Sequence, residues 1–178
     1  MERLGERAGR VDDAAIAEAR RMGHPYVGTE HLLLGLLSVE GPARDALRRA
    51  GVTAEAARAK VIEAVGDLDQ SPSHAGARPR QPVSAGTPDF SDRARRALER
   101  ASRLSLHRRD PDVEPEHVLV GLLDVEGRAG QVLRGLGVDM AALQRDAELR
   151  VGEDFDAEPE PPSPPLPPPN MAGPHCAH

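Results

Sequence analysis

The sequence predicts an all-α fold made of two tandem four-helix repeats related by a pseudo-twofold axis. The stretch VGTEHLLLGLLSVEG at 27–41 returns as VEPEHVLVGLLDVEG at 113–127, an offset of 86 residues. An internal repeat of this regularity indicates two copies of one supersecondary unit. The chain has two Phe, one Tyr and no Trp. Its apolar residues are mainly Ala, Leu and Val, a composition that favours helices over strands.

The first repeat is expected to contain four helices, separated by Gly and Pro. The segment GHPYVG at 23–28 ends the first helix, because Pro25 and its glycines are costly inside a helix. Gly41 is the expected left-handed C-cap of the second helix, Pro42 opens the third, and Thr53 caps the fourth. We expect these helices at about 4–22, 29–39, 42–50 and 53–65.

The second repeat follows the same plan, with Ser91 as the cap of its first helix and Pro115 at the start of its second. We expect helices at about 91–108, 115–124, 128–136 and 139–150. A four-helix unit of this size has little core of its own, so two copies packed together bury more apolar surface. The residues expected in the shared core are Leu32, Leu33, Leu36, Leu37, Leu119, Leu122 and Leu123.

Composition divides the chain into a folded part at 1–150 and an acidic, Pro-rich tail at 151–178 that we expect to be disordered. Within the folded part, repeat one covers about 1–65, a Gly/Pro/Ser-rich linker covers 66–89, and repeat two covers about 90–150. The two repeats carry equal numbers of acidic and basic side chains, ten of each in the first and eleven of each in the second. This neutrality argues against a nucleic-acid-binding surface.

Several classes of chemistry have no motif in the chain. Lys60 is the one lysine and lies outside any P-loop pattern, and HExxH, CxxC and GxSxG are absent. The C-terminal HCAH could offer His175, Cys176 and His178 to a soft metal, but a terminal segment with three ligands is a weak signal. We therefore expect no enzyme activity, no catalytic residue, no cofactor and no structural metal.

The cellular compartment is also constrained by the sequence. One cysteine allows no internal disulfide, the charged N-terminus lacks the apolar region of a signal peptide, and no run of about 18 apolar residues occurs. These features predict a cytoplasmic protein that does not enter a membrane.

The doubled pattern GHPYVGTEHLLLGL, complete at 23–36 and partial at 109–122, closely resembles the N-terminal Clp repeat domain of Hsp100 unfoldases of the ClpC and ClpA type. The resemblance covers about residues 1–150, without the ATPase modules that usually follow, so the chain looks like a free-standing N-domain. The family implies a non-enzymatic recognition module for substrates and adaptors. Its expected partners are components of a Clp unfoldase and protease, adaptors, or client proteins marked with phosphoarginine.

The resemblance also implies ligand residues for phosphoarginine, one site in each repeat. Glu30 and Glu116 match the family's guanidinium-binding Glu, and Ser91 matches its phosphate-binding hydroxyl, whereas repeat one has Gly5 at that position. Repeat two is therefore expected to bind better. The alternative is that both Glu residues only favour a helix start through the helix dipole. His31 and His117 are expected to be packed, hydrogen-bonded structural residues.

Phe90 stands at the junction of the linker and repeat two, where the family has an aromatic lining a groove between the repeats. Cyclic-peptide antibiotics bind there in ClpC-type members, so sequestration of such a compound is an alternative function. A further alternative is a structural or regulatory scaffold that docks a partner through the Pro-rich tail. For Phe90 itself, a hydrophobic staple at a helix start is an equal possibility.

Overall fold

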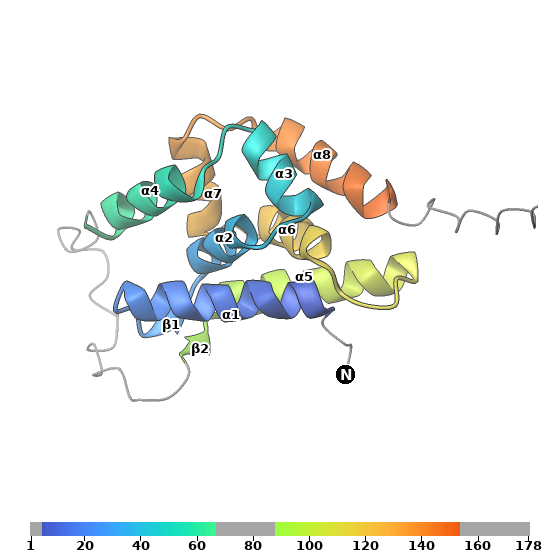
Figure 1. Cartoon of the computed structure of the whole chain (residues 1–178), viewed down its shortest axis with the longest axis horizontal. Helices are drawn as coiled ribbons and strands as arrows, with labels where there is room; N and C mark the ends of the chain where they lie inside the picture. The colour runs from blue at the N-terminus through green and yellow to red at the C-terminus, as the bar shows by residue number, and fades with distance from the viewer. Residues whose placement is uncertain (1–4, 67–87, 154–178) are drawn as a thin grey trace, which may run out of the picture.

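The computed structural model describes residues 5–66 and 88–153, which form eight helices and one short parallel sheet (Figure 1). The linker and the tail expected from the sequence lie almost wholly outside these ranges. The elements are α1 Glu6–Arg21, β1 Tyr26–Val27, α2 Thr29–Ser38, α3 Pro42–Arg49, α4 Ala54–Gly66, β2 Asp89–Phe90, α5 Asp92–Arg108, α6 Pro115–Asp124, α7 Arg128–Gly135 and α8 Met140–Glu153. All eight helices were predicted, with boundaries that differ by at most three residues.

The helix starts follow the expected capping chemistry. Ser91 Oγ accepts from the N–H of Ala94 at 3.3 Å, and Thr53 Oγ1 accepts from the N–H of Ala56 at 3.2 Å. The expected role of Gly41 is wrong. Gly41 is the N-cap of α3, with φ 149° and ψ 179°, and α2 ends before it. A backbone with this φ favours glycine because it brings the chain into the next helix without a Cβ clash.

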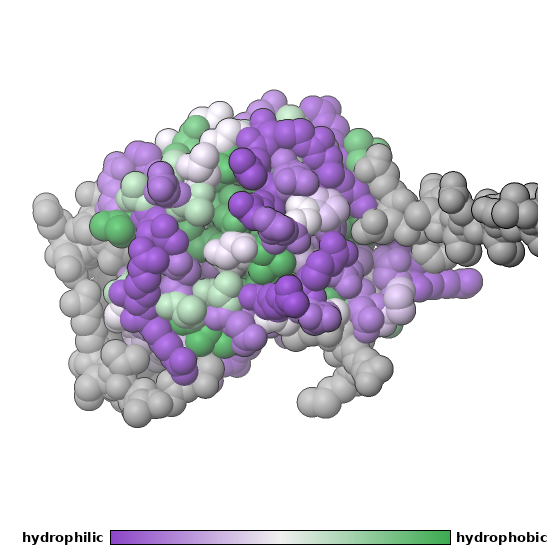
Figure 2. Space-filling view, in the orientation of Figure 1, coloured by the Kyte–Doolittle hydropathy of each residue, from purple (hydrophilic) through white to green (hydrophobic). Residues whose placement is uncertain are grey.

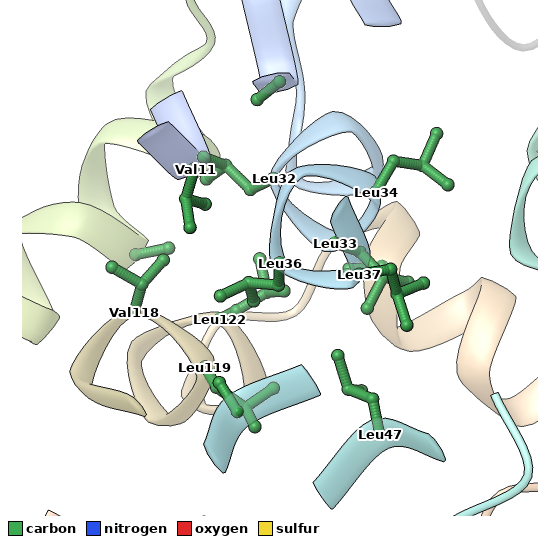
Figure 3. Packing of buried hydrophobic residues seen from close by; sticks show 14 of the residues in the cluster. Val11, Leu32, Leu33, Leu34, Leu36, Leu37, Leu47, Val118, Leu119 and Leu122 are labelled. Atoms are coloured by element: carbon green, nitrogen blue, oxygen red, sulfur yellow. The ribbon is translucent and has the colours of Figure 1, made fainter. Parts of the chain in front are cut away.

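Helices α2 and α6 lie at the centre of the molecule, with α1 and α5 along one side and the pairs α3–α8 and α4–α7 on the other (Figure 1). Leu36 of α2 lies beside Leu122 of α6, whereas Leu32 points toward Val11 of α1, and all of them belong to one continuous core (Figure 3). Six of the seven predicted core leucines are buried, but Leu123 is only partly buried at the edge of the core. The two repeats therefore share one core, as predicted.

Each repeat begins with a tight helical hairpin that depends on a glycine. An ideal Cβ on Gly121 would lie only 3.0 Å from the backbone nitrogen of Ala101 on α5. In repeat one, an ideal Cβ on Gly35 would similarly lie 3.3 Å from the backbone nitrogen of Ala15 on α1. Both contacts are closer than a side chain normally allows, so these glycines let the paired helices touch backbone to backbone.

The feature that the sequence did not predict is a two-stranded parallel sheet between the repeats. Tyr26 pairs with Asp89 and Val27 with Phe90, and the N–H of Ser91 extends the pairing to the carbonyl of Val27 at 2.9 Å. Strands of two residues have no detectable period-2 pattern, which is why they were missed. The sheet fixes the end of β1 beside the end of β2, and thus α2 beside the start of α5.

Figure 2 shows that hydrophilic residues cover most of the visible face, with apolar residues confined to small areas. None of the helices in residues 5–66 and 88–153 combines the length and hydropathy that a bilayer-spanning helix needs.

Candidate functional site

Three helix starts meet at one corner of the molecule, and the residues come from both repeats. The sheet places Ser91 at the start of α5 beside Val27, which leads into α2. The start of α7 joins them, because Thr29 Oγ1 accepts from the N–H of Ala129 at 3.3 Å. We call this group corner I and define it by Gly28, Glu30, Ser91 and Arg128.

A second corner lies at the positions offset by 86 residues, as the pseudo-twofold requires. The N–H of Gly5 donates to the carbonyl of Val113 at 2.9 Å, so the starts of α1 and α6 are side by side. The start of α3 is also close, because an ideal Cβ on Gly41 would lie 3.8 Å from Glu116 Oε1. We call this group corner II and define it by Gly5, Arg7, Glu114 and Glu116.

The structure does not bring Ser91 and Glu116 together, although the family resemblance implied that both belong to one site in repeat two. The α5–α6 hairpin is antiparallel, with Gly121 of α6 against Ala101 of α5. Glu116 therefore lies near the C-terminal end of α5, whereas Ser91 caps its N-terminal end. At 1.5 Å per residue the two positions are about 20 Å apart along the helix. Each corner is assembled across the repeats, so Ser91 shares a corner with Glu30, and Gly5 shares one with Glu116.

Glu30 is the carboxylate of corner I and is only 6% exposed. Its side chain folds back over its own helix start, so that an ideal Cβ on Gly28 would lie 2.6 Å from Glu30 Cδ. Arg128, at the first position of α7, donates from Nη1 to Glu30 Oε1 at 3.4 Å. Glu30, for which the family resemblance implied guanidinium binding, thus already contacts a guanidinium of the chain itself.

Corner II has the same backbone plan but different charges. Glu116 is 2% exposed, so both corners contain a buried carboxylate. Glu114 occupies the position of Gly28, and an ideal Cβ on Gly5 would lie 3.0 Å from Glu114 Cδ. Arg7 Nε donates to Glu114 Oε2 at 3.1 Å. The space next to Gly5, where corner I has the Ser91 hydroxyl, is therefore filled by a carboxylate.

The two histidines have the structural role that the sequence predicted. The N–H of Gly28 donates to His31 Nδ1 at 2.8 Å, and the N–H of Glu114 donates to His117 Nδ1 at 3.1 Å. Each ring therefore closes a capping box at its helix start. Burial lowers the pKa of His31 to about 4, with the charge of nearby His24 lowering it further and Glu30 opposing the shift. His31 is accordingly neutral at physiological pH.

His24, Glu30 and His31 lie close enough to be considered as cation ligands, with their ligand atoms within 4.8 Å of one another. The tautomer of His31 argues against this use. Its Nδ1 accepts a backbone N–H, so in the neutral ring the proton is on Nε2, which lies 2.7 Å from His24 Nδ1. Both ring nitrogens are committed, and a metal at Nε2 would require the capping hydrogen bond to be lost.

Phe90 is half-buried and packs against the edge of the core, on the strand that joins the repeats. This position fits its expected place between the repeats, and it fits the staple interpretation equally. Two surface hollows, of about 380 and 390 Å³, lie elsewhere: one between α3 and α8, and one beside α1 and the end of α2. Phe90 lines neither of them.

Sequence reasoning missed Arg128 and Glu114 as members of the corners. Arg128 belongs to repeat two but contacts the carboxylate of repeat one, and nothing in a linear comparison of the repeats reveals that contact. Glu114 could have been found from the sequence, because the 86-residue offset aligns it with Gly28. An acidic residue therefore stands where the first repeat has a glycine.

The comparisons with known proteins all match members of one family. The model of the Clp repeat (R) N-terminal domain matches residues 3–85 and 89–168. A ClpA homolog from Cyanidium caldarium, described as an ATP-binding subunit of an ATP-dependent Clp protease, is 38% identical over 86% of this chain. The aligned region is 17% of that relative's length, so the chain spans about a sixth of it.

Solved structures agree with this result. The N-terminal domain of ClpD from Arabidopsis thaliana is 31% identical, with a TM-score of 0.67, and the match covers 84% of this chain and 95% of that domain. A ClpV N-domain solved in complex with a VipB peptide has a TM-score of 0.55 over 85% of this chain and 88% of that domain. At 18% identity, this second similarity establishes the fold alone.

Proposed function

The chain belongs to the family of Clp repeat N-terminal domains, and we propose that it is a non-enzymatic recognition module of a Clp unfoldase and protease system. Its ligands would be peptides, adaptors or proteins marked with phosphoarginine. The proposal is supported by relatives described as ATP-binding subunits of Clp proteases. It is also supported by the ClpV N-domain, of the same fold, that was solved with a bound peptide.

The observation that carries the phosphoarginine proposal is the composition of corner I. The Glu30 carboxylate can accept two parallel hydrogen bonds from a guanidinium. Ser91 is the N-cap of α5, where a hydroxyl and the positive end of a helix favour a phosphate. A phosphoarginine side chain carries these two groups next to each other, and corner I offers a partner to each.

Corner I is the stronger of the two proposed sites, which reverses the ranking expected from the sequence. Glu116 still offers a carboxylate in corner II, but its neighbour Gly5 has no hydroxyl. The carboxylate of Glu114 also fills the space beside Gly5 and would repel a phosphate. One hydrogen bond to a charged group contributes roughly 1.5–3 kcal/mol, which corresponds to about ten- to a hundredfold in affinity. Glu30 and Ser91 are therefore the primary ligands, and Glu116 belongs to a weaker site.

Titration with phosphoarginine, followed by NMR of backbone amides, tests the proposal. Signals of Gly28, Ser91 and Ala129 report corner I, and those of Gly5, Gly41 and Glu114 report corner II. Glu30→Gln should remove most of the binding at corner I, whereas Glu116→Gln, the matched control, should leave that corner unchanged. No shift at corner I in millimolar phosphoarginine would contradict the phosphoarginine proposal, and a larger loss in Glu116→Gln would contradict the ranking.

The broader proposal has its own test. Addition of a Clp unfoldase, and separately of its adaptors, to the labelled protein should broaden or shift signals of a defined surface. Magnesium-dependent ATP hydrolysis by the pure protein, above that of a heat-inactivated sample, would contradict a non-enzymatic module.

The cyclic-peptide alternative depends on Phe90, whose place on the strand between the repeats is compatible with this alternative and equally with a hydrophobic staple. If a compound of this class binds, Phe90→Ala should weaken binding while the shifts of corner I caused by phosphoarginine remain. Equal binding by the wild type and Phe90→Ala would exclude a groove lined by this side chain.

A further inference from the structure

Arg128 distinguishes corner I from an ordinary carboxylate site. Its Nη1 lies 3.4 Å from Glu30 Oε1, and its side chain remains 35% exposed while that of Glu30 is 7% exposed. A single long hydrogen bond from a partly exposed arginine leaves the remaining guanidinium donors available to another acceptor. Arg128 can therefore keep its position near Glu30 and still contact a ligand.

The first repeat supplies an internal comparison. The position equivalent to Arg128 is Pro42, which has no charge and opens α3. Helices α3 and α7 each have eight residues and begin at equivalent places in the two repeats. An arginine is thus not required to form this helix start, and its presence in corner I needs another explanation.

We infer that Arg128 is the specificity-determining residue of corner I, which makes this corner select a phosphorylated guanidinium over a free one. The inference rests on the proposed function. Glu30 and Arg128 form an ion pair whose charges are opposite to those of a phosphoguanidine. The ligand guanidinium pairs with Glu30, and its phosphoryl group, with a negative charge of between one and two, pairs with Arg128 and the Ser91 hydroxyl.

An unmodified arginine has different electrostatic interactions with Glu30 and Arg128 in corner I. Its guanidinium competes with Arg128 for Glu30, and the two like charges repel each other in a partly buried site where solvent screening is reduced. It has no anion with which to engage Arg128 in return. The ion pair therefore rejects the unmodified side chain and accepts the modified one.

The test compares the dissociation constants of phosphoarginine and arginine at corner I, from shifts of Gly28, Ser91 and Ala129, in the full chain. Three variants are used: Arg128→Gln, which removes the charge but keeps an amide donor; Arg128→Lys, which keeps the charge; and Arg44→Gln. Arg44 is the control because it is an arginine of α3 that pairs with the exposed Glu40. The amides of corner II check in the same spectra that each variant is folded.

In Arg128→Gln we expect phosphoarginine to bind about tenfold more weakly, because one charge-assisted hydrogen bond is lost. Arginine should bind at least about threefold more tightly, because Glu30 no longer has a competing cation. Arg128→Lys should keep most of the preference for phosphoarginine, and Arg44→Gln should keep all of it.

If phosphoarginine binds at corner I and Arg128→Gln leaves the ratio of the two constants unchanged, the role of Arg128 is refuted while the proposed function stands. Tighter binding of both ligands in Arg128→Gln would show that Arg128 only blocks the site, which also refutes selectivity. If neither ligand shifts corner I in any variant at millimolar concentration, both the inference and the phosphoarginine proposal are wrong.

Discussion

Protonation of His31, at the start of α2, makes the stability of the fold depend on pH. Its folded-state pKa of about 4 is below the ordinary value of 6.5, because burial of the ring disfavours its charged form. Between these two values the unfolded chain binds more protons than the folded one, so stability is complete above pH 6.5 and decreases as the pH falls toward 4. We expect a loss of about 2 kcal/mol from this group between pH 7 and pH 5.

The variant His31→Gln separates this effect from other titrations. A glutamine at the same position can still accept from the N-cap N–H, as in an ordinary capping box, but it does not titrate. Urea unfolding at pH 7 and pH 5 should therefore show a smaller loss in His31→Gln than in the wild type. An equal loss in both proteins would mean that His31 is not the group responsible.

Asp12 makes the stability depend on pH in the opposite direction. Burial, followed by the charge of Asp13, raises the pKa of Asp12 to about 6, and Asp12 Oδ1 is buried without a hydrogen-bond partner among the described residues. An acid with a raised folded-state pKa destabilises the protein at neutral pH, and this penalty disappears as the pH falls from 6 toward 4. The equivalent position in repeat two is Leu98, which packs against the core.

We therefore predict that Asp12→Leu stabilises the protein at pH 7 by about 1–3 kcal/mol. The gain should shrink at pH 4.5, where the wild-type carboxyl group is protonated in the folded state. Urea unfolding at the two pH values measures both quantities. A gain that does not depend on pH would assign the effect to apolar packing rather than to the buried charge.

At the scale of elements, Gly121 and Gly130 form a matched pair in helices of repeat two. A Cβ on Gly121 would press against the backbone of α5, whereas a Cβ on Gly130 would meet nothing within 4 Å. Gly121→Ala should destabilise the protein by about 1–3 kcal/mol through overpacking of the α5–α6 hairpin. Gly130→Ala should stabilise it by up to about 1 kcal/mol, because alanine has the higher helix propensity. Thermal unfolding that ranks the two variants the other way would show that the hairpin is not packed backbone to backbone.

The helices could be predicted from the sequence because each has its own local signals. Ser91, Thr53 and Pro42 mark helix starts by capping chemistry that acts within one turn, and the apolar runs at 32–37 and 118–122 mark the core. The 86-residue offset between the repeats then gave the helix boundaries of the second repeat from those of the first. The strands Tyr26–Val27 and Asp89–Phe90 had no such signal, because their pairing depends on contacts between residues more than 60 positions apart.

At the scale of the whole molecule, the site could be predicted only as a set of residues and not as an arrangement. The sequence comparison correctly identifies Glu30 with Glu116 and Gly5 with Ser91 as equivalent positions. Equivalence does not tell which of them are neighbours. The pseudo-twofold exchanges the repeats, so that each corner combines the second helix of one repeat with the first helix of the other. That is why Ser91 lies with Glu30, and why the contact between Arg128 and Glu30 was not expected.

We propose that Glu30 and Ser91, from different repeats, act on one ligand. A double-mutant cycle in phosphoarginine affinity at corner I tests it most directly, because residues that act together give non-additive effects and distant residues give additive ones. The cycle of Glu30→Gln with Ser91→Ala should show a coupling of at least about 0.5 kcal/mol. The cycle of Glu116→Gln with Ser91→Ala should be additive within error. Coupling of Ser91 to Glu116, with none to Glu30, would contradict the assembly of the site across the repeats.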